Sequence, residues 1–485
     1  MASIHTLPPE LLVTIFLCYT EVLADKYEHA PELSSSIVAS RHACVEDMLL
    51  RSGDVPLRLL PRIQEEETED SLKAYSLAFS YLHRFTNVTL RLTNELRGLL
   101  CQPNVVQVAN SSSLQKLSVD FLHLRYFDSK QTPLLGHITF PALQHFVIRG
   151  GDLRSCAPML SSSLRHLELR SMDSYLTGKE LATYLPGLKN LLTLVIVGVL
   201  WDDPDDFSDP DTWVPHQTII FPLLRQLRVT GSCPAYICRL FAHIVYPAST
   251  HVKIELHNLD MNLDALPSVV GQIFAPHAAG AALPGPTPAF RRVTVEERFT
   301  DDAFIQGWAD AAPADAQTAT DGTLQPLLTL NATRDHDIAA GMLEHLSLSG
   351  VVDLRVANVD LSSYAWAALF RALPELHSLS VMGFSPVSTL PDALPRQGLS
   401  HLKSIRYDLS WTETPIEPFS DLAEALARRK RHESRLETLT VVLAPEHRVS
   451  EVDEEIKRSS YEVVRAIRFT RLVAGEWWSS SKVEV

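Results

Sequence analysis

The stretch SLRHLEL, residues 163–169, carries the pattern that decides the fold of this chain. Its apolar positions are Leu164, Leu167 and Leu169, so the last three residues alternate apolar, polar, apolar. Successive side chains of a strand point to opposite faces of the sheet. The alternation therefore predicts a β-strand with one buried face.

The same pattern, apolar-x-x-apolar-x-apolar, returns along most of the chain. Weaker copies begin near Phe85, His251 and Val351. The clear copies are SLQKLSV (113–119), ALQHFVI (142–148), SLRHLEL (163–169), LLTLVI (191–196), LLRQLRV (223–229), AFRRVTV (289–295), ELHSLSV (375–381), HLKSIRY (401–407) and RLETLTV (435–441). From Phe85 to Leu224 the first apolar positions are 29, 29, 21, 27 and 33 residues apart. A leucine-rich repeat has roughly 20–29 residues, so the spacing predicts such repeats with loop insertions in the longer copies.

Between the copies lie stretches with an apolar stripe at helical spacing, among them 178–191, 364–376 and 419–431. A strand and a helix of this size cannot bury their apolar faces alone, but stacked neighbours can. The expected fold is therefore an α/β leucine-rich-repeat solenoid of about a dozen repeats, with parallel strands on the concave face and helices on the convex face. The alternative is a doubly wound sheet, which is less favoured because no glycine-rich phosphate turn follows any strand.

Length and composition restrict the classes of function. A chain of 485 residues with 46% apolar residues predicts several domains or a repeat array rather than a disordered protein. The formal net charge of −15 argues against nucleic-acid binding and against docking on anionic lipid, both of which need a basic face. No secretion signal is visible, and six scattered cysteines suit buried thiols in a reducing compartment. We expect a cytoplasmic or nuclear protein.

The N-terminal stretch LPPELLVTIF, residues 7–16, is a second informative pattern. Proline is favoured at the first position of a helix, and an acid such as Glu10 is favoured in the first turn. Leu11, Leu12, Ile15 and Phe16 then share one helical face. These features predict an amphipathic helix over residues 8–24.

This helix resembles the first helix of an F-box. The residues that match the family pattern position by position are Leu7, Pro8, Glu10, Leu11, Leu12, Ile15 and Phe16. The resemblance implies that these seven residues bind the Skp adaptor of a cullin ubiquitin ligase, while the repeats behind them bind a protein substrate. The order of motif and repeats is similar to that of F-box and leucine-rich-repeat proteins of mushroom-forming fungi.

The resemblance ends after the first helix. A complete F-box continues through two more helices with conserved tryptophans, whereas this chain has no tryptophan before Trp201. The F-box is thus shortened, either as a degenerate variant or through a lost exon. The other interpretation of the apolar face of the helix is that it packs on the first repeats as an N-terminal cap, which a solenoid needs.

These observations predict a domain organisation. Residues 1–50 form a partial F-box-like helical segment, and residues 51–474 form the irregular solenoid, with its first strand near 56–60. Insertions are expected near 202–211, 275–290 and 310–322, and a frayed tail at 475–485. The aspartate-rich stretch 201–213 is interpreted as a solvated loop, or else as a contact for a basic partner.

No motif points to catalysis or to a cofactor. The chain contains no G-x-S-x-G, H-E-x-x-H or P-loop pattern, and no His or Cys pairs at zinc spacing. Asp335, His336 and Asp337 are more simply explained by a turn than by a metal. The expectation is a receptor subunit without enzymatic activity, metal or cofactor; the alternative is a non-catalytic interaction scaffold whose first helix only caps the repeats.

Overall fold

The chain is represented by a computed structural model in which it divides into two compact units, Met1–Ser174 and Tyr175–Val485. The residues that the structure describes are 36–39, 41–60, 68–102, 113–121, 134–135, 138–151, 153–171, 183–198, 219–231, 237, 240–241, 244–247, 249–256, 290–298, 302–309, 326, 328–333, 348–359, 361–394, 399–410, 415–430, 436–444, 464–472 and 480–483.

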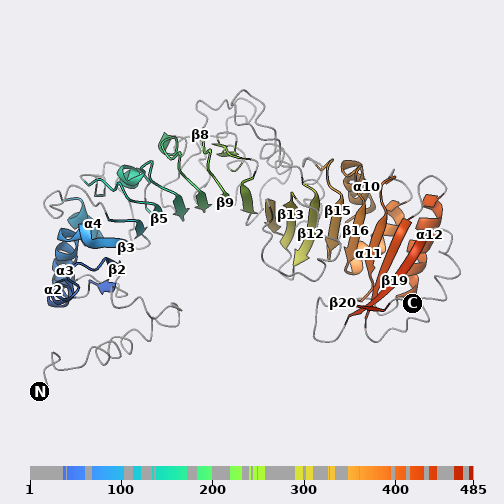
Figure 1. Cartoon of the computed structure of the whole chain (residues 1–485), viewed down its shortest axis with the longest axis horizontal. Helices are drawn as coiled ribbons and strands as arrows, with labels where there is room; N and C mark the ends of the chain where they lie inside the picture. The colour runs from blue at the N-terminus through green and yellow to red at the C-terminus, as the bar shows by residue number, and fades with distance from the viewer. Residues whose placement is uncertain are drawn as a thin grey trace, which may run out of the picture. The chain divides into compact units, whose positions relative to one another are not determined.

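The first unit contains a parallel sheet in which each strand pairs with the next one along the chain (Figure 1). Its strands are β1 (Ser36–Val38), β2 (Leu57–Leu60), β3 (Phe85–Arg91), β4 (Lys116–Asp120), β5 (His145–Arg149) and β6 (His166–Arg170). Its helices are α2 (His42–Arg51), α3 (Glu69–Ser80), α4 (Asn94–Leu100) and the short α5 (Leu153–Cys156), with 3₁₀ turns at Leu82–Arg84 and Ala157–Met159.

Local sequence explains where α3 begins and how it is held. Thr68 and Ser71 exchange hydrogen bonds between side chain and backbone as a capping box, which satisfies free N–H groups of the first turn. Tyr75 and Phe79 on this helix are fully buried. The guanidinium of Arg84 donates to the Leu49 carbonyl at 3.0 Å, which ties the end of α2 to the turn before β3.

The second unit contains a longer sheet. Its strands are β7 (Thr193–Val197), β9 (Gln226–Gly231), β11 (His251–Leu256), β12 (Arg292–Arg298), β13 (Asp302–Trp308), β14 (Leu328–Thr333), β15 (Asp353–Ala357), β16 (Ser378–Met382), β17 (Ser404–Asp408), β18 (Leu436–Leu443), β19 (Val464–Leu472) and β20 (Ser480–Val483). The helices α10 (Ser363–Ala372), α11 (Phe384–Ala393) and α12 (Ile416–Lys430) alternate with strands β15 to β18. A separate parallel pair consists of β8 (Ile219–Ile220) and β10 (Ile244–Val245).

One part of this sheet departs from the order of the chain. β11 pairs with β14 in parallel, β14 pairs with β13 and β13 with β12 in antiparallel, and β12 pairs with β15 in parallel. The spatial order is thus β11, β14, β13, β12, β15, followed by β16 to β19 in sequence order (Figure 1). A three-stranded antiparallel meander therefore interrupts the otherwise parallel run.

The pattern seen in the sequence returns as a repeated backbone contact. In β5 and the strands paired with it, the Gln115 carbonyl accepts from the N–H groups of Gln144 and His145, and the Gln144 carbonyl accepts from Arg165 and His166. The same pair of bonds links successive copies in the second unit, with acceptors at Leu192, Arg291, Val352, His377 and Lys403. Each acceptor is the residue directly after the first apolar position of a copy. Val352 is the acceptor in the weaker copy that begins at Val351.

The strand predictions are confirmed. All nine clear copies contain a strand, and their three apolar positions are at most 2% exposed. The weaker copies correspond to β3, β11 and β15. The molecule is therefore an α/β protein with a large, mostly parallel sheet. The helices expected at 364–376 and 419–431 are α10 and α12, whereas β13 and β14 were not predicted.

The helices of the second unit cover one face of the sheet, and Tyr407 shows how. Its hydroxyl donates to the Val387 carbonyl of α11 at 2.5 Å, with the Pro418 carbonyl of α12 at 3.2 Å as a second acceptor. Val387 would normally bond to the N–H four residues later, but that residue is Pro391, which has none. A side chain from the sheet thus donates the hydrogen bond that the Val387 carbonyl lacks because of Pro391.

The predicted domain boundaries remain predictions, because several of the segments they concern lie outside the described residues. This applies to 202–211, 275–289, 310–322 and most of 475–485. Residues 36–50, expected in the helical segment, contribute β1 and most of α2, and β1 pairs with β2 in parallel. Within the expected frayed tail, β20 pairs antiparallel with β19, so backbone hydrogen bonds hold that part of it as a strand. Among the described helices, none is both long and apolar enough to cross a membrane.

The contact between Tyr407 and α11 gives a first prediction. Tyr407→Phe leaves the Val387 carbonyl without its donor inside a buried region, so the free energy of unfolding should fall by about 1–3 kcal/mol. Tyr364→Phe is the matched control, because Tyr364 on α10 is 72% exposed and its change should be within about 0.5 kcal/mol. Urea unfolding of both variants tests this; equal stabilities would contradict it.

The meander gives a second prediction at Gly307. A Cβ at this position would lie 2.6 Å from the ring of Phe290, which is fully buried. Gly307→Ala should therefore lower the free energy of unfolding by about 1–3 kcal/mol through overpacking. Gly187→Ala in the same unit meets nothing within 4 Å and serves as the control. A melting temperature of Gly307→Ala that matches the control would show that Phe290 moves aside without cost.

Candidate functional site

The adaptor-binding residues that the sequence predicts, Leu7, Pro8, Glu10, Leu11, Leu12, Ile15 and Phe16, all lie outside the described residues. The same holds for the predicted helix 8–24 and for the aspartate-rich stretch 201–213. The site that the structure does describe is a face of the sheet, the one opposite the buried side chains of the repeats.

Strand pairing aligns the side chains on each face of the sheet in rows that run across the strands. In the second unit one buried row consists of Val293, Leu354, Leu379, Ile405 and Leu439. The residues two positions later in the same strands form a second buried row. The alternate positions lie on the other side of the sheet, which we call the polar face. In β15 and β17 the polar residues at these positions are Asp353, Arg355, Ser404, Arg406 and Asp408.

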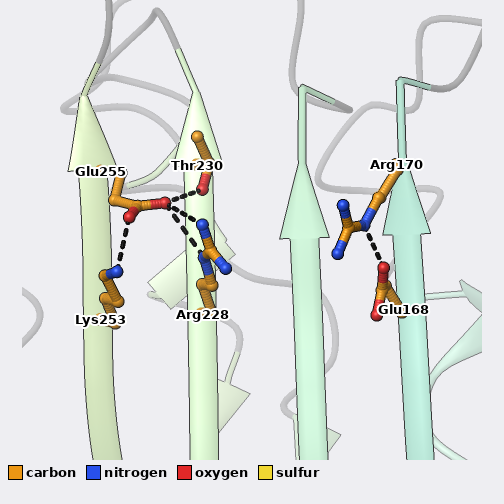
Figure 2. Close-up of polar contacts among 6 residues, drawn as sticks. All are labelled: Glu168, Arg170, Arg228, Thr230, Lys253 and Glu255. Carbon is orange, nitrogen blue, oxygen red and sulfur yellow. Dashed lines mark hydrogen bonds and ion pairs between the residues drawn. The ribbon is translucent and has the colours of Figure 1, made fainter. Parts of the chain in front are cut away.

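A cluster of charged groups lies on the polar face at β9 and β11 (Figure 2). The buried Glu255 carboxylate accepts two hydrogen bonds from the Arg228 guanidinium, at 3.0 and 2.7 Å. It also accepts one from the Thr230 hydroxyl at 2.9 Å, and the Lys253 ammonium lies 2.7 Å from its other oxygen. Two cations therefore face one carboxylate, and the cluster carries a net charge of +1.

These contacts determine the ionisation of Glu255. Burial alone would raise the pKa of its carboxyl. The hydrogen bonds from Lys253, Arg228 and Thr230, together with the charge of Arg228, outweigh burial and lower the pKa of Glu255 to about 2. The carboxylate is thus ionised at every physiological pH, and it fixes the positions of both cations.

A second group of charges lies on the polar face between β12 and β17. Burial lowers the pKa of the Arg355 and Arg406 guanidiniums and raises the pKa of the Asp353 and Asp408 carboxyls. The Asp408 carboxylate accepts from the backbone N–H of Ser410 at 3.0 Å and from its hydroxyl at 2.5 Å. Asp408 therefore stabilises the turn that follows β17.

The meander adds an aromatic contact to this group. Arg292 of β12 lies directly opposite Trp308 of β13, and its guanidinium carbon is 4.2 Å from the centre of the indole ring. This is a cation–π geometry, in which the ring face attracts the positive charge. The indole ring therefore stabilises the positive charge of Arg292.

The first unit has its own polar face. There Glu168 forms an ion pair with Arg170 (Figure 2), and the imidazole Nε2 of His166 lies 3.5 Å from the second Glu168 oxygen. His166 stacks on His145, with ring centroids 5.3 Å apart. Burial first, and then the charge of His166, lower the pKa of His145. This arrangement disfavours protonation of His145.

None of these groups forms a recognisable reaction centre. Within the described part of the chain, no three His, Cys, Asp or Glu side chains gather as metal ligands. Of the free thiols described, only Cys156 is buried; Cys101 is half-buried and Cys44 is exposed, so the expectation of buried thiols is wrong for Cys44. The polar face presents charged side chains held in place by contacts with one another, and no arrangement for a covalent reaction is found among them.

Comparison with known proteins adds no identification: no protein-family model matches the chain, and no curated protein matches it. Function therefore has to be inferred from the residues and their geometry.

The charged groups of the polar face were missed as a site by sequence reasoning. A signal was present, because the repeat copies place Arg228, Lys253, Arg355 and Arg406 at polar alternate positions of their strands. The missing information was the register, which decides that Glu255 lies beside Thr230 and that Arg355 and Arg406 fall in one row.

The Glu255 cluster predicts a pH-dependent contribution to stability. The pKa of this carboxyl is about 2 in the folded protein against 4.5 ordinarily, so its contribution is present above pH 4.5 and is lost as the pH falls toward 2. Glu255→Gln should lower the free energy of unfolding by about 2–3 kcal/mol at pH 7, and the difference should shrink below pH 4.5.

Urea unfolding of the wild type and Glu255→Gln at several pH values measures this effect. Glu437→Gln is the control, since Glu437 is 51% exposed and lies 3.8 Å from Lys403. A surface pair of this kind contributes less than about 1 kcal/mol. A stability loss in Glu255→Gln that does not change with pH would contradict the assignment.

Proposed function

We propose that this chain is the substrate-recognition subunit of a Skp–cullin–F-box ubiquitin ligase. In this proposal the N-terminal helix binds the Skp adaptor, and a leucine-rich-repeat solenoid binds a protein substrate. The chain itself does no chemistry and needs no metal or cofactor. It raises the effective concentration of the substrate near the enzyme that transfers ubiquitin.

The observation that carries the proposal is the order of two features. A stretch that matches the first F-box helix at Leu7, Pro8, Glu10, Leu11, Leu12, Ile15 and Phe16 precedes a long array of parallel strands. The repeated backbone bonds and the buried apolar rows support the assignment of the array to leucine-rich repeats. The polar face supports protein capture, because it presents charged side chains from several adjacent strands.

The proposed compartment is the cytoplasm or the nucleus, where such ligases work and where free thiols are kept reduced. The described cysteines Cys44, Cys101 and Cys156 are free, in agreement with this placement.

A second candidate is a free-standing interaction scaffold whose first helix only caps the repeats. It is favoured by the shortened F-box, and by β1, which follows residue 35 and pairs with β2 of the sheet. The two candidates differ in what Phe16 does. In the receptor it contacts the adaptor, and in the scaffold it packs on the chain's own repeats.

Co-purification of the full chain with the Skp adaptor of its host tests the proposal. Phe16→Ala should weaken adaptor binding by about 2 kcal/mol or more if Phe16 is a hot spot of the interface. Leu50→Ala is the matched control, because Leu50 is an apolar residue of α2 that is 76% exposed. It should leave adaptor binding unchanged.

A variant without residues 1–34 provides a second control, since it removes the predicted helix but keeps β1, which pairs with β2. It should lose the adaptor and still unfold cooperatively. A well-folded wild-type chain that retains no adaptor would reject the receptor function. If Phe16→Ala then lowers the melting temperature, the scaffold with a capping helix is the better account.

A further inference from the structure

Basic side chains gather on the polar face of the first unit, where β4, β5 and β6 begin. Strand pairing places Lys116 beside His145 and His145 beside His166. The two imidazole rings stack with their centroids 5.3 Å apart. Arg165 directly precedes His166, and its charge acts on His145. We call Lys116, His145, Arg165 and His166 the basic cluster.

The two permanent cations of the basic cluster are open to solvent. Lys116 and Arg165 are exposed, while His145 and His166 are half-buried. Within the described part of the chain, neither the Lys116 ammonium nor the Arg165 guanidinium takes part in a hydrogen bond or an ion pair. An approaching group can therefore reach both cations without displacing an acid of the chain.

Each described acid of β4 to β6 lies beside a cation of its own. Glu168 of β6 forms its ion pair with Arg170 (Figure 2), and its second oxygen lies 3.5 Å from Nε2 of His166. Asp120 of β4 is paired in register with Arg149 of β5. The charges of Lys116 and Arg165 thus remain as an excess of +2, in a chain whose formal net charge is −15.

The charges that act on His145 show the same excess. Burial lowers the pKa of His145 first, and the charges of His166, Lys116 and Arg165 lower it further. A proton added to His145 would place positive charge among positive charges, which is why its neutral form is favoured. An anion bound beside these groups would reverse the effect and raise the pKa of His145 again.

The width of the basic cluster indicates the kind of ligand that fits it. Neighbouring strands lie about 4.8 Å apart, so Lys116 on β4 and His166 on β6 are about 10 Å apart. An extended chain advances about 3.3 Å per residue, so about three residues span this distance. A short acidic segment can place carboxylates along the whole cluster, whereas one small anion reaches only part of it.

We propose that the basic cluster binds a short acidic segment of a partner protein, and that His145 takes up a proton from solvent as the segment binds. Carboxylates of the segment pair with the Lys116 ammonium and the Arg165 guanidinium, and their negative charge favours the protonated imidazole of His145. The inference rests on the proposed function, because it gives the captured protein a chemical class. It concerns a different surface from the adaptor helix, so the two can fail separately.

Binding of synthetic peptides to the full chain, without adaptor, tests the inference by fluorescence anisotropy. The probe is a peptide with blocked ends and four consecutive glutamates between glycines, and the control peptide has glutamine at the four positions. The glutamate peptide should bind and the glutamine peptide should not. Binding of the glutamate peptide should weaken as salt screens the charges.

The pH dependence of binding tests the role of His145. Glutamate has a pKa of about 4.3, so the charge of the probe is nearly constant between pH 7.5 and pH 6. The pKa of His145 lies below its ordinary value of 6.5 in the free chain and rises when the acidic segment binds, so affinity increases as the pH falls. The probe should bind about threefold or more tightly at pH 6 than at pH 7.5.

Matched variants locate the contacts of the two cations. Lys116→Gln combined with Arg165→Gln should weaken binding of the probe about tenfold, because two charge pairs are lost. Both residues are exposed, so this variant should fold as the wild type does. The control is Arg51→Gln combined with Lys73→Gln, which removes the same charge from α2 and α3 of the same unit, where each residue pairs with an acid of its own helix. It should leave binding unchanged.

Histidine variants separate His145 from the general titration of the chain, which has 19 histidines. His145→Gln should bind the probe with nearly equal affinity at pH 6 and pH 7.5. His401→Gln is the matched control, because His401 also stacks on a second histidine, His377, with ring centroids 5.9 Å apart. It should keep the pH dependence of the wild type.

The outcomes separate the inference from the proposed function. Selective binding of the glutamate peptide that depends on Lys116 and Arg165, and whose pH dependence is lost in His145→Gln, supports the inference whether or not the adaptor binds. Equal binding of the two peptides, no binding of either, or binding that is the same in the Lys116 and Arg165 variant as in its control overturns it. An unchanged pH dependence in His145→Gln overturns the uptake of a proton by His145. Adaptor binding is measured in the absence of peptide.

Discussion

The structure depends on one repeated backbone interaction, in which a carbonyl just after the first apolar position of a copy accepts N–H groups of the next copy in the sheet. At Gln115, Gln144, His377 and Lys403 this interaction fixes the register before each strand begins. With the register fixed, apolar positions face apolar positions along the whole row. A slip of one residue would turn every strand over and place its leucines on the wrong side. The buried core and the polar face are consequences of the same constraint.

The meander of β12, β13 and β14 shows how strictly this constraint is kept. Two of its pairings are antiparallel and its order runs against the chain, yet Val295 still pairs with Ile305 and Ile305 with Leu330. The apolar face thus continues through the interruption. Because Gly307 has no side chain, the ring of Phe290, the first apolar position of a copy, fits beside it and is buried. The meander keeps the register of the sheet, so the strands on both sides of it, β11 and β15, remain aligned.

These elements also explain what the sequence could predict. Short-range alternation located the strands correctly, because burial of Leu164, Leu167 and Leu169 follows from residues within one copy. The order β11, β14, β13, β12, β15 could not be predicted, because it depends on pairings between residues up to about eighty positions apart. The charged residues of the polar face could be recognised in the sequence. Which of them lie side by side could not be predicted, because that depends on the pairing of the strands.

The two charged groups of the second unit differ in how their charges are balanced. At β9 and β11, Glu255 lies between Arg228 and Lys253, and its low pKa shows that the cluster is satisfied internally. Along β15 to β17 the acids Asp353 and Asp408 lie near Arg355 and Arg406, and hydrogen bonds from Ser378 and Ser410 also stabilise their ionised forms. Partial burial of these charges costs free energy, and the opposite charges close by offset part of that cost.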